Sequence, residues 1–323
     1  MAVNDTLAAW SDTAFTASIV VYSVAIVGYA GEYAFGRQGR VARTSAAQTG
    51  PAPVGTIEGP PNRQHMATRL GRVGLAGTAL GALMQLLSLT LRGIAAGRAP
   101  WANMFEFASA VALVAVVAFL WVQYSAPKLR HLGLFVLVPV VFVLVYAGLE
   151  LYTEAAPLIA ALRSYWLVIH VAAAIISVGV LFTSGVLAAL YLVRQRYERG
   201  LIEDAPAPKA IVALGPRLPD ATVLDRLSYR LVAFAFPIFT FMVIAGAIWA
   251  ESAWGRFWGW DPNETWALIV WLVYAGYLHA RATAGWKGTK AARINLLGFF
   301  AITFNFLVIN LVVAGLHSYS GLT

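Results

Sequence analysis

Long apolar stretches alternate with short polar ones along most of this chain. Eight of the apolar stretches are about as long as the roughly 20 residues that a helix needs to cross a bilayer. They cover residues 14–35, 70–91, 103–124, 132–149, 165–193, 230–250, 265–281 and 294–316. The pattern predicts an all-α polytopic membrane protein with about eight transmembrane helices.

Composition supports this prediction. Of the 323 residues, 60% are hydrophobic and 12% are charged, and the mean hydropathy is +0.71. Soluble domains carry roughly 25% charged residues. We expect a single membrane domain over residues 1–323, interrupted by two proline-containing polar loops at 36–69 and 194–229, which are predicted to be flexible and cytoplasmic.

The basic residues indicate how the chain lies in the membrane. With eight spans, 19 of the 23 Lys and Arg residues fall on one side, and the other side holds only Arg92, Arg98, Arg163 and Arg256. The positive-inside rule places the basic side in the cytoplasm, so both termini and the connection between the sixth and seventh spans are predicted to be extracytoplasmic. This asymmetry accounts for the net charge of +8, and no nucleic-acid partner is needed to explain it.

Tryptophan is concentrated in that sixth connection. Residues 254–266 read WGRFWGWDPNETW, which contains Trp254, Trp258, Trp260 and Trp266. Indole rings offer large flat apolar faces with one polar N–H each, so a cluster of them suits a wide, flat, partly polar ligand such as a porphyrin. The alternative is an aromatic belt at the membrane surface, which fits Trp166, Trp249 and Trp271 but does not explain the W-x₃-W-x-W-D spacing.

The polar residues of this segment also have structural interpretations. Asp261, followed by Pro262 and by Glu264 three residues on, has the pattern of a helix capping box, which we favour over direct ligand contact. Arg256 is the charged residue inside the aromatic cluster. It could pair with a carboxylate of a porphyrin, or with Glu251 or Asp261.

Three of the five histidines lie in or beside predicted spans. His170 is about one turn inside the fifth span, and His317 follows the eighth, so both are predicted to lie on the same membrane face as the tryptophans. Neutral imidazole is a common axial ligand of haem iron. Each histidine taken alone could equally be an interfacial residue that hydrogen-bonds to a neighbour.

His279 is predicted to lie deeper, about 21 Å along the seventh span at 1.5 Å per residue from Thr265. An ionisable residue at such a depth is a candidate functional residue, although it could also extend toward the cytoplasmic surface beside Arg281. At the start of the third span, Asn103 and Glu106 share one helical face. They could form a cap, a wall of the outer site or a partner contact.

Taken in order, these motifs resemble a known family. The Asn103/Glu106 pair, His170, the tryptophan segment, His279 and His317 are similar to the haem-handling proteins of cytochrome c maturation that carry a WWD signature. Within them the chain resembles the CcsA or ResC proteins of System II, called CcsB in some lineages. Asn263 departs from the family, which often has lysine at that position.

The resemblance implies a function with a membrane partner of the ResB/CcsB type. Such a complex moves haem b outward and attaches it to the CXXCH thiols of apocytochrome c, as a cytochrome c synthase, or haem lyase, in the bacterial plasma membrane. His170 and His317 match the external haem ligands, and His279 matches a transmembrane histidine whose second ligand comes from the partner. Trp254, Trp258, Trp260, Trp266, Arg256 and Asp261 would line the outer haem site, supported by Asn103, Glu106 and Glu264.

Two other functions remain open at this point. One is haem transfer without thioether formation, as in proteins resembling CcmC, and the other is a dihaem electron-transfer subunit. The second would need pairs of histidines on facing helices at two depths, which the sequence does not favour. The chain has no cysteine, so any thiol must belong to a partner or a substrate.

Overall fold

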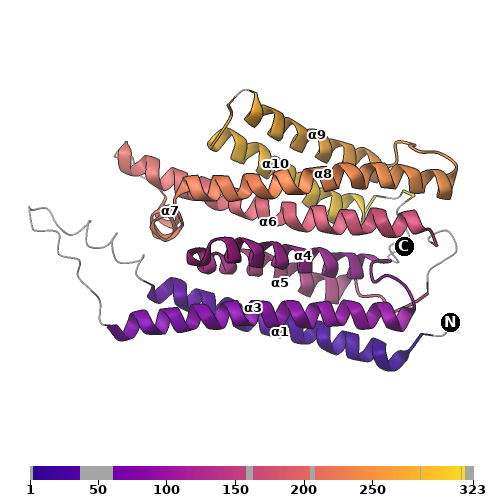
Figure 1. The fold of residues 1–323 in the computed structure, drawn as a ribbon, viewed down its shortest axis with the longest axis horizontal. Helices are drawn as coiled ribbons and strands as arrows, with labels where there is room; N and C mark the ends of the chain where they lie inside the picture. Colours follow the sequence, from indigo (N-terminus) through magenta and orange to yellow (C-terminus); the bar gives the residue numbers. More distant parts are fainter. Residues whose placement is uncertain are drawn as a thin grey trace, which may run out of the picture.

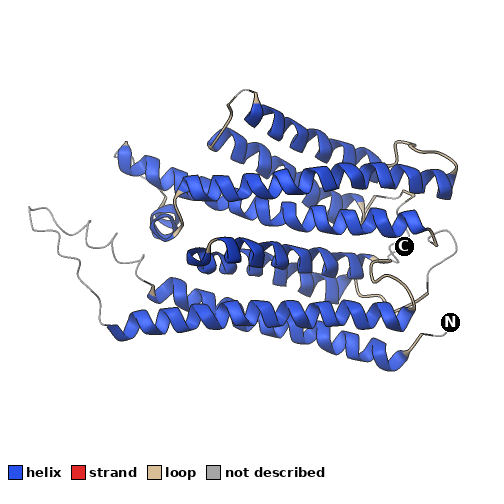
Figure 2. Ribbon diagram, viewed as in Figure 1, coloured by secondary structure: helices blue, strands red, loops and turns tan. Residues whose placement is uncertain are grey.

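The computed structural model describes residues 3–36, 61–157, 163–203, 208–283, 285–313 and 315–316. Within these ranges the chain is helical and contains no strand (Figure 2). The long helices run side by side along one axis, as expected for a membrane bundle (Figure 1). This confirms the all-α polytopic fold.

Eight long helices form the described part of the bundle. They are α1 (Asp5–Phe35), α3 (Pro61–Ala96), α4 (Met104–Ser125), α5 (Gly133–Glu150), α6 (Tyr165–Ile202), α8 (Ala221–Trp254), α9 (Pro262–Ala282) and α10 (Thr289–Phe304). The short elements are the 3₁₀ turns η2 (Pro127–Leu132) and η4 (Gly215–Arg217), the helix α7 (Lys209–Leu214), and a π-helical turn, η5 (Asn305–Ile309), that continues α10.

Seven of the described helices are long and apolar enough to cross a membrane, and α9 is the predicted span that is not among them. Its tryptophans and tyrosines, together with His279 and Arg281, lower its hydropathy. With 21 residues it is nevertheless about 31 Å long. It packs beside α8 and α10 and runs along the bundle at an incline to α8 (Figure 1).

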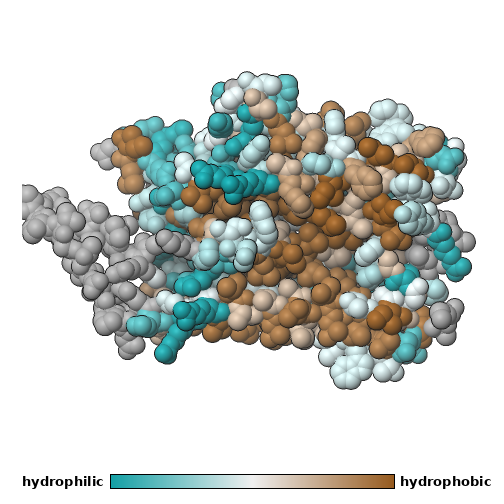
Figure 3. Space-filling view, in the orientation of Figure 1, coloured by the Kyte–Doolittle hydropathy of each residue, from teal (hydrophilic) through white to brown (hydrophobic). Residues whose placement is uncertain are grey.

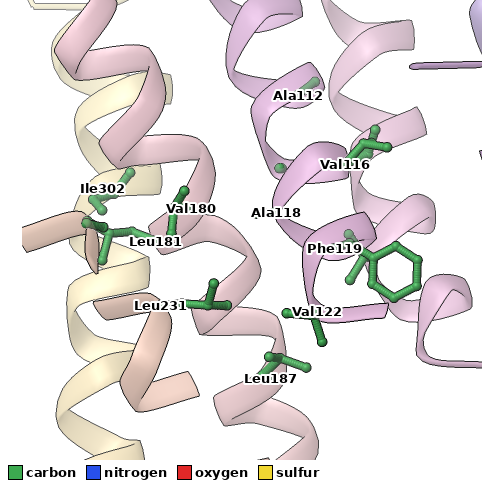
Figure 4. Close-up of a cluster of buried hydrophobic side chains, with 14 of the residues drawn as sticks. Ala112, Val116, Ala118, Phe119, Val122, Val180, Leu181, Leu187, Leu231 and Ile302 are labelled. Atoms are coloured by element: carbon green, nitrogen blue, oxygen red, sulfur yellow. The ribbon is translucent and has the colours of Figure 1, made fainter. Parts of the chain in front are cut away.

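The helices are arranged as successive pairs. Helix α1 packs mainly on α3, α4 lies between α5 and α6, α6 packs mainly on α8, and α9 packs on α10. The interior joins these pairs through small and branched side chains, such as Val116 and Phe119 of α4 and Leu181 and Leu187 of α6, all at most 1% exposed (Figure 4). This continuous core joins the helix pairs into one bundle.

The helices extend further than the apolar stretches. Helix α3 begins nine residues before position 70, and α6 ends nine residues after position 193, inside the predicted loops. Hydropathy indicates where a span leaves the hydrocarbon core of the bilayer. A helix can continue beyond that point as long as its backbone hydrogen bonds remain favourable. Arg194 donates from Nη1 to the carbonyls of Gly215 (2.8 Å) and Leu218 (3.1 Å), which fixes the α7–η4 connection against α6. Residues 37–60 and 204–207 lie outside the described residues, so their predicted flexibility stays a prediction.

The surface follows the same division. Hydrophobic side chains cover the middle of the bundle, and hydrophilic ones gather toward its two ends (Figure 3). The start of α1 lies at the same end as the α8–α9 connection (Figure 1). That end also carries Arg92 and Arg98, two of the four basic residues predicted to be extracytoplasmic.

The charge asymmetry predicts the side of the membrane on which this end lies. A reporter that is active only outside the cytoplasm, fused after Leu322, is expected to be active, because 19 of the 23 basic residues lie on the opposite side. The same reporter inserted after Glu203 is expected to be silent, while a cytoplasm-only reporter works there. The reverse pattern of activities would show that the orientation is wrong.

Candidate functional site

A cavity of about 210 Å³ lies at the end of the bundle that carries the tryptophan segment. Its walls come from the start of α4, from α6, α8, α9 and α10, and from the α8–α9 connection. Apolar and aromatic side chains make up most of the lining, among them Trp101, Phe107 and Phe306. Enclosed small-molecule sites usually measure roughly 300–1,000 Å³. A large flat ligand would therefore have to separate part of these walls.

His170 lies on α6 in the wall of this cavity. Its Nδ1 is 2.8 Å from the backbone oxygen of Met242 on α8. A carbonyl only accepts hydrogen bonds, so Nδ1 carries a proton, and in the neutral imidazole Nε2 then has the lone pair. The ring stacks on Trp249, with centroids 6.3 Å apart and planes 17° apart. The imidazole is therefore held in one tautomer and one orientation, the form in which Nε2 binds a metal.

The aromatic-belt interpretation is wrong for Trp249. This residue is only 2% exposed and lines the cavity between His170 and Trp254, whose ring is 4.8 Å away at 63°. Trp254 and Trp258 also line the cavity. The aromatic wall thus includes a tryptophan from inside α8 as well as those of the connecting segment.

Three polar atoms in this lining are buried without a hydrogen-bond partner. They are Nε1 of Trp258, Oδ1 of Asn263 and Oδ1 of Asn305. An unsatisfied buried polar group costs about 1–3 kcal/mol. Their position in one cavity indicates that a ligand with polar groups at its edge would relieve this cost.

The turn that carries the tryptophans is organised by its own polar residues. Helix α8 ends at Trp254, followed by Gly255 in the left-handed region at φ +69°, whose amide donates to Glu251 O at 2.8 Å. Glu264 accepts from the amides of Gly259 (2.8 Å) and Asp261 (3.2 Å). Asp261 caps α9 through Asn263 N at 3.1 Å, which completes the predicted capping box. Glu264 additionally reaches the cavity wall, and Asp261 does not line it.

The remaining predicted residues of this segment lie beside the cavity and do not line it. Arg256 pairs with Glu264 at 3.5 Å and not with the predicted Glu251 or Asp261, and its guanidinium lies over the Trp254 ring. Trp260 is 68% exposed and has φ +59°, an uncommon backbone conformation for a side chain of this size. Trp266 donates from Nε1 to Ala301 O at 2.7 Å and so joins α9 to α10.

The end of α10 departs from the predicted span 294–316. Regular α-helix stops at Phe304, and a π-helical turn follows, in which the Asn305 carbonyl accepts from both N and Nδ2 of Asn310 at 3.0 Å. Asn305 and Asn310 both line the cavity. One extra residue in the turn changes which side chains face inward, and π-turns are frequent at functional sites.

The two other predicted iron ligands are His317 and His279. His317 is outside the described residues, but the amide of Leu316 donates to Asp261 Oδ1 at 2.7 Å, so the described chain ends beside the tryptophan segment. His279 lies 17 residues after Pro262, about 26 Å along α9 from its start. It is exposed on the surface of the bundle, and it takes no part in the cavity.

Asn103 caps the start of α4, and the Glu106 side chain reaches back to the residue before this cap. Asn103 Oδ1 accepts from Glu106 N, and Glu106 Oε2 accepts from Ala102 N, both at 2.8 Å. Asn103 lines the cavity, while Glu106 is fully buried behind it. Glu106 pairs there with Arg92 at 2.8 Å and with Arg98 at 2.6 Å. This three-residue charge cluster fixes the segment that precedes α4 against α3.

The cluster also reaches α1 and the end of α5. Arg92 contacts Asp12 at 3.4 Å and donates to Thr153 O. Tyr152 donates to Asp12 Oδ2 at 2.7 Å. Burial and the Asp12 carboxylate raise the pKa of Tyr152, so it remains a donor across the physiological pH range. The polar network therefore connects the outer helices α1 and α3 to the wall of the cavity.

The sequence matches a model of the cytochrome C assembly protein family over residues 101–317. It is 37% identical over 262 residues to the cytochrome c biogenesis protein CcsA of Guillardia theta, covering 77% of this chain and 86% of the relative. It is 35% identical over 290 residues to the CcsA protein of Gloeothece citriformis, covering 77% of this chain and 88% of that protein. The chain belongs to the cytochrome c assembly protein family. Its role is in cytochrome c biogenesis.

The match begins at Trp101, the first residue of the cavity wall along the chain. Several cavity residues of this family member were missed from sequence, namely Trp101, Phe239, Met242, Gly246, Asn305 and Asn310. Asn305 and Asn310 carried a detectable signal, since two asparagines five residues apart interrupt an apolar span. Gly246 and Met242 carried none, because both are ordinary residues of a transmembrane helix.

The buried charge cluster predicts a strong effect on stability. Replacing Glu106 with alanine is expected to lower the free energy of unfolding by about 3–5 kcal/mol, because two buried arginines lose their partner. Thermal unfolding of the purified protein in detergent measures this. Glu203→Ala is the matched control, since its i,i+4 pair with Arg199 is half exposed and is expected to contribute only about 0.3–0.5 kcal/mol. Equal stability losses in the two variants would contradict the structural role of Glu106.

Proposed function

We propose that this protein binds haem b in the cavity at the tryptophan-rich end and presents it for attachment to apocytochrome c. The observation that carries the proposal is the orientation of His170, whose Nδ1 donates to Met242 O, so that Nε2 has the lone pair in an aromatic cavity. Membership of the cytochrome c assembly family supports it.

The residues of the cavity fit a porphyrin. Indole faces of Trp249, Trp254 and Trp258 provide flat apolar contact area. The unpartnered polar atoms of Trp258, Asn263 and Asn305 would meet the polar edge of such a ligand. We infer that His317 supplies the second axial ligand, and the bond from Leu316 N to Asp261 supports this by bringing the chain to the same end of the bundle.

The chemistry of attachment requires little from this chain. Each cysteine thiol of an apocytochrome adds its S–H across a haem vinyl group, forming one C–S and one C–H bond without net oxidation. This chain, which has no cysteine, binds and orients the haem and excludes water with its aromatic wall. We propose that a ResB/CcsB-type partner completes the synthase in a bacterial plasma membrane, with the tryptophan segment on the extracytoplasmic side.

An absorbance spectrum of the purified complex tests the proposal. We expect a haem b spectrum with two nitrogen axial ligands, and its loss or conversion in His170→Ala. Co-expression with an apocytochrome, with and without the partner, separates synthase activity from haem transfer alone. If cytochrome c forms without any ResB-type partner, the proposed need for that partner is wrong. If no haem copurifies under reducing conditions, the proposed function is wrong.

The dihaem electron-transfer alternative receives less support. It needs pairs of histidines on facing helices, and among the described residues His170 is the one histidine that lines the cavity. His279 faces away from the bundle. Potentiometric titration of the purified chain would reveal a second tightly held haem if that alternative applied.

A further inference from the structure

Helix α8 provides a close-fitting contact surface for the imidazole of His170. The ring lies between the Met242 carbonyl, 2.8 Å from Nδ1, and the indole of Trp249, which is nearly parallel to it. By α-helical bonding, the Met242 carbonyl is the partner of the amide of Gly246, four residues on. The imidazole therefore bonds a carbonyl that already belongs to the backbone ladder of α8, and it must approach the helix axis closely to do so.

Gly246 is what permits this approach. A Cβ atom at position 246 would lie 2.6 Å from Nδ1 and 2.7 Å from Cε1 of His170, closer than real Cβ contacts. Glycine inside a helix is less favourable than alanine by about 1 kcal/mol. Its φ is not in the left-handed region, so backbone conformation does not require glycine there. The contact with His170 is the physical reason for glycine at this position.

We propose that Gly246 is a positioning residue for His170: it holds the imidazole in the Nδ1–H tautomer with Nε2 directed at the ligand iron. This inference rests on the proposed function, in which His170 is an axial ligand. A hydrogen bond from the distal ring nitrogen to a carbonyl fixes the orientation of a ligating histidine and raises its basicity. Gly246 thereby acts on the haem through His170, without contacting the iron.

The test uses the full chain with its partner and the substitution Gly246→Ala. The added methyl group displaces the ring and breaks the Nδ1–Met242 bond, so we expect at least a tenfold loss of haem affinity or cytochrome c yield, in the range seen for such supporting groups. The retained haem is expected to show a spectrum with one histidine ligand lost or weakened, and a higher midpoint potential. Ile244→Ala is the control in the same helix, because Ile244 of α8 is exposed and does not line the cavity, and it should behave as wild type.

A double variant separates positioning from simple packing. In a His170→Ala background the space beside Gly246 is open, so adding Gly246→Ala is expected to cause no further loss of haem. It should also restore normal protein levels if Gly246→Ala alone misfolds. An unchanged spectrum and haem content in Gly246→Ala, or an equal additional loss in the His170→Ala background, would overturn the proposal. If His170→Ala itself leaves haem unaffected, the proposed function fails, and the positioning role fails with it.

Discussion

Replacing His170 with alanine is expected to abolish cytochrome c assembly. The substitution removes the imidazole whose Nε2 has the lone pair in the cavity, and it leaves the Met242 carbonyl without its side-chain donor. A haem held by one axial histidine binds less tightly and is more readily lost or oxidised. Covalently bound haem in a reporter cytochrome, measured by peroxidase staining of a denaturing gel, quantifies the effect.

Added imidazole distinguishes loss of a ligand from loss of the fold. The small molecule can occupy the space left by the missing side chain and bind the same iron position, so partial recovery of assembly is expected in His170→Ala. His65→Ala serves as the matched control, because His65 is exposed on α3, and it should assemble cytochrome c normally. Full activity of His170→Ala without imidazole would remove this residue from the proposed ligand set.

The membrane architecture was predictable because hydrophobic thickness and loop charge are read directly from the sequence. The fifth predicted span and α6 begin at the same residue, Tyr165, and the fourth predicted span and α5 differ by one residue at each end. Helix ends outside the lipid were less predictable. The extensions of α3 and α6 depend on contacts such as those of Arg194 with the α7–η4 connection, which no local pattern encodes.

The cavity was only partly predictable because it forms between segments distant in sequence. His170 and the tryptophans were detectable as unusual residue types in an apolar chain. Trp249 was assigned to the membrane belt, because its depth inside the bundle depends on how α8 rotates against α6. Gly246 could not be predicted for a similar reason. The need for glycine there comes from contact with His170, which is 76 positions away in the sequence.

Two further features could not be predicted from the sequence. The π-turn that starts at Asn305 adds a residue to the helical repeat, so periodicity alone places the inward face of α10 wrongly beyond Phe304. Arg92, counted as a basic residue of the outer side, is 1% exposed and pairs with Glu106 and Asp12. Residues distant in sequence decide both the pairing and the burial of such a charge.

The position of His279 along its span was predicted, but the direction of its side chain was not. Leu272, Gly276 and His279 follow the i, i+4, i+7 spacing of one helical face, and all three are exposed. Helix α9 lies at the edge of the bundle (Figure 1). An exposed imidazole at this position is open to a group from outside the chain, and we propose that a ResB/CcsB-type partner supplies the second ligand there.

We therefore expect His279→Ala to lower the haem content of the complex at both the inner and the outer site, and to block cytochrome c assembly. The physical reason is that His279 lies about 26 Å along α9 from the tryptophan-rich end, too far to contact an outer haem. A loss at the outer site must then arise from failed delivery through an inner one. Haem per complex, determined as the pyridine haemochrome, measures the effect in the wild type and in the variant.

Two comparisons make the result specific to the imidazole. Leu272→Ala changes an exposed residue on the same face of α9, two turns nearer the tryptophan end, and should retain wild-type haem if only the ligand matters. Wild-type chain purified without the proposed partner should hold little haem at the proposed inner site, because the second axial ligand that we assign to that partner would be missing. If His279→Ala keeps wild-type haem and assembles cytochrome c normally, the residue is a polar side chain at the bundle surface near the cytoplasm, and haem reaches the outer site by another route.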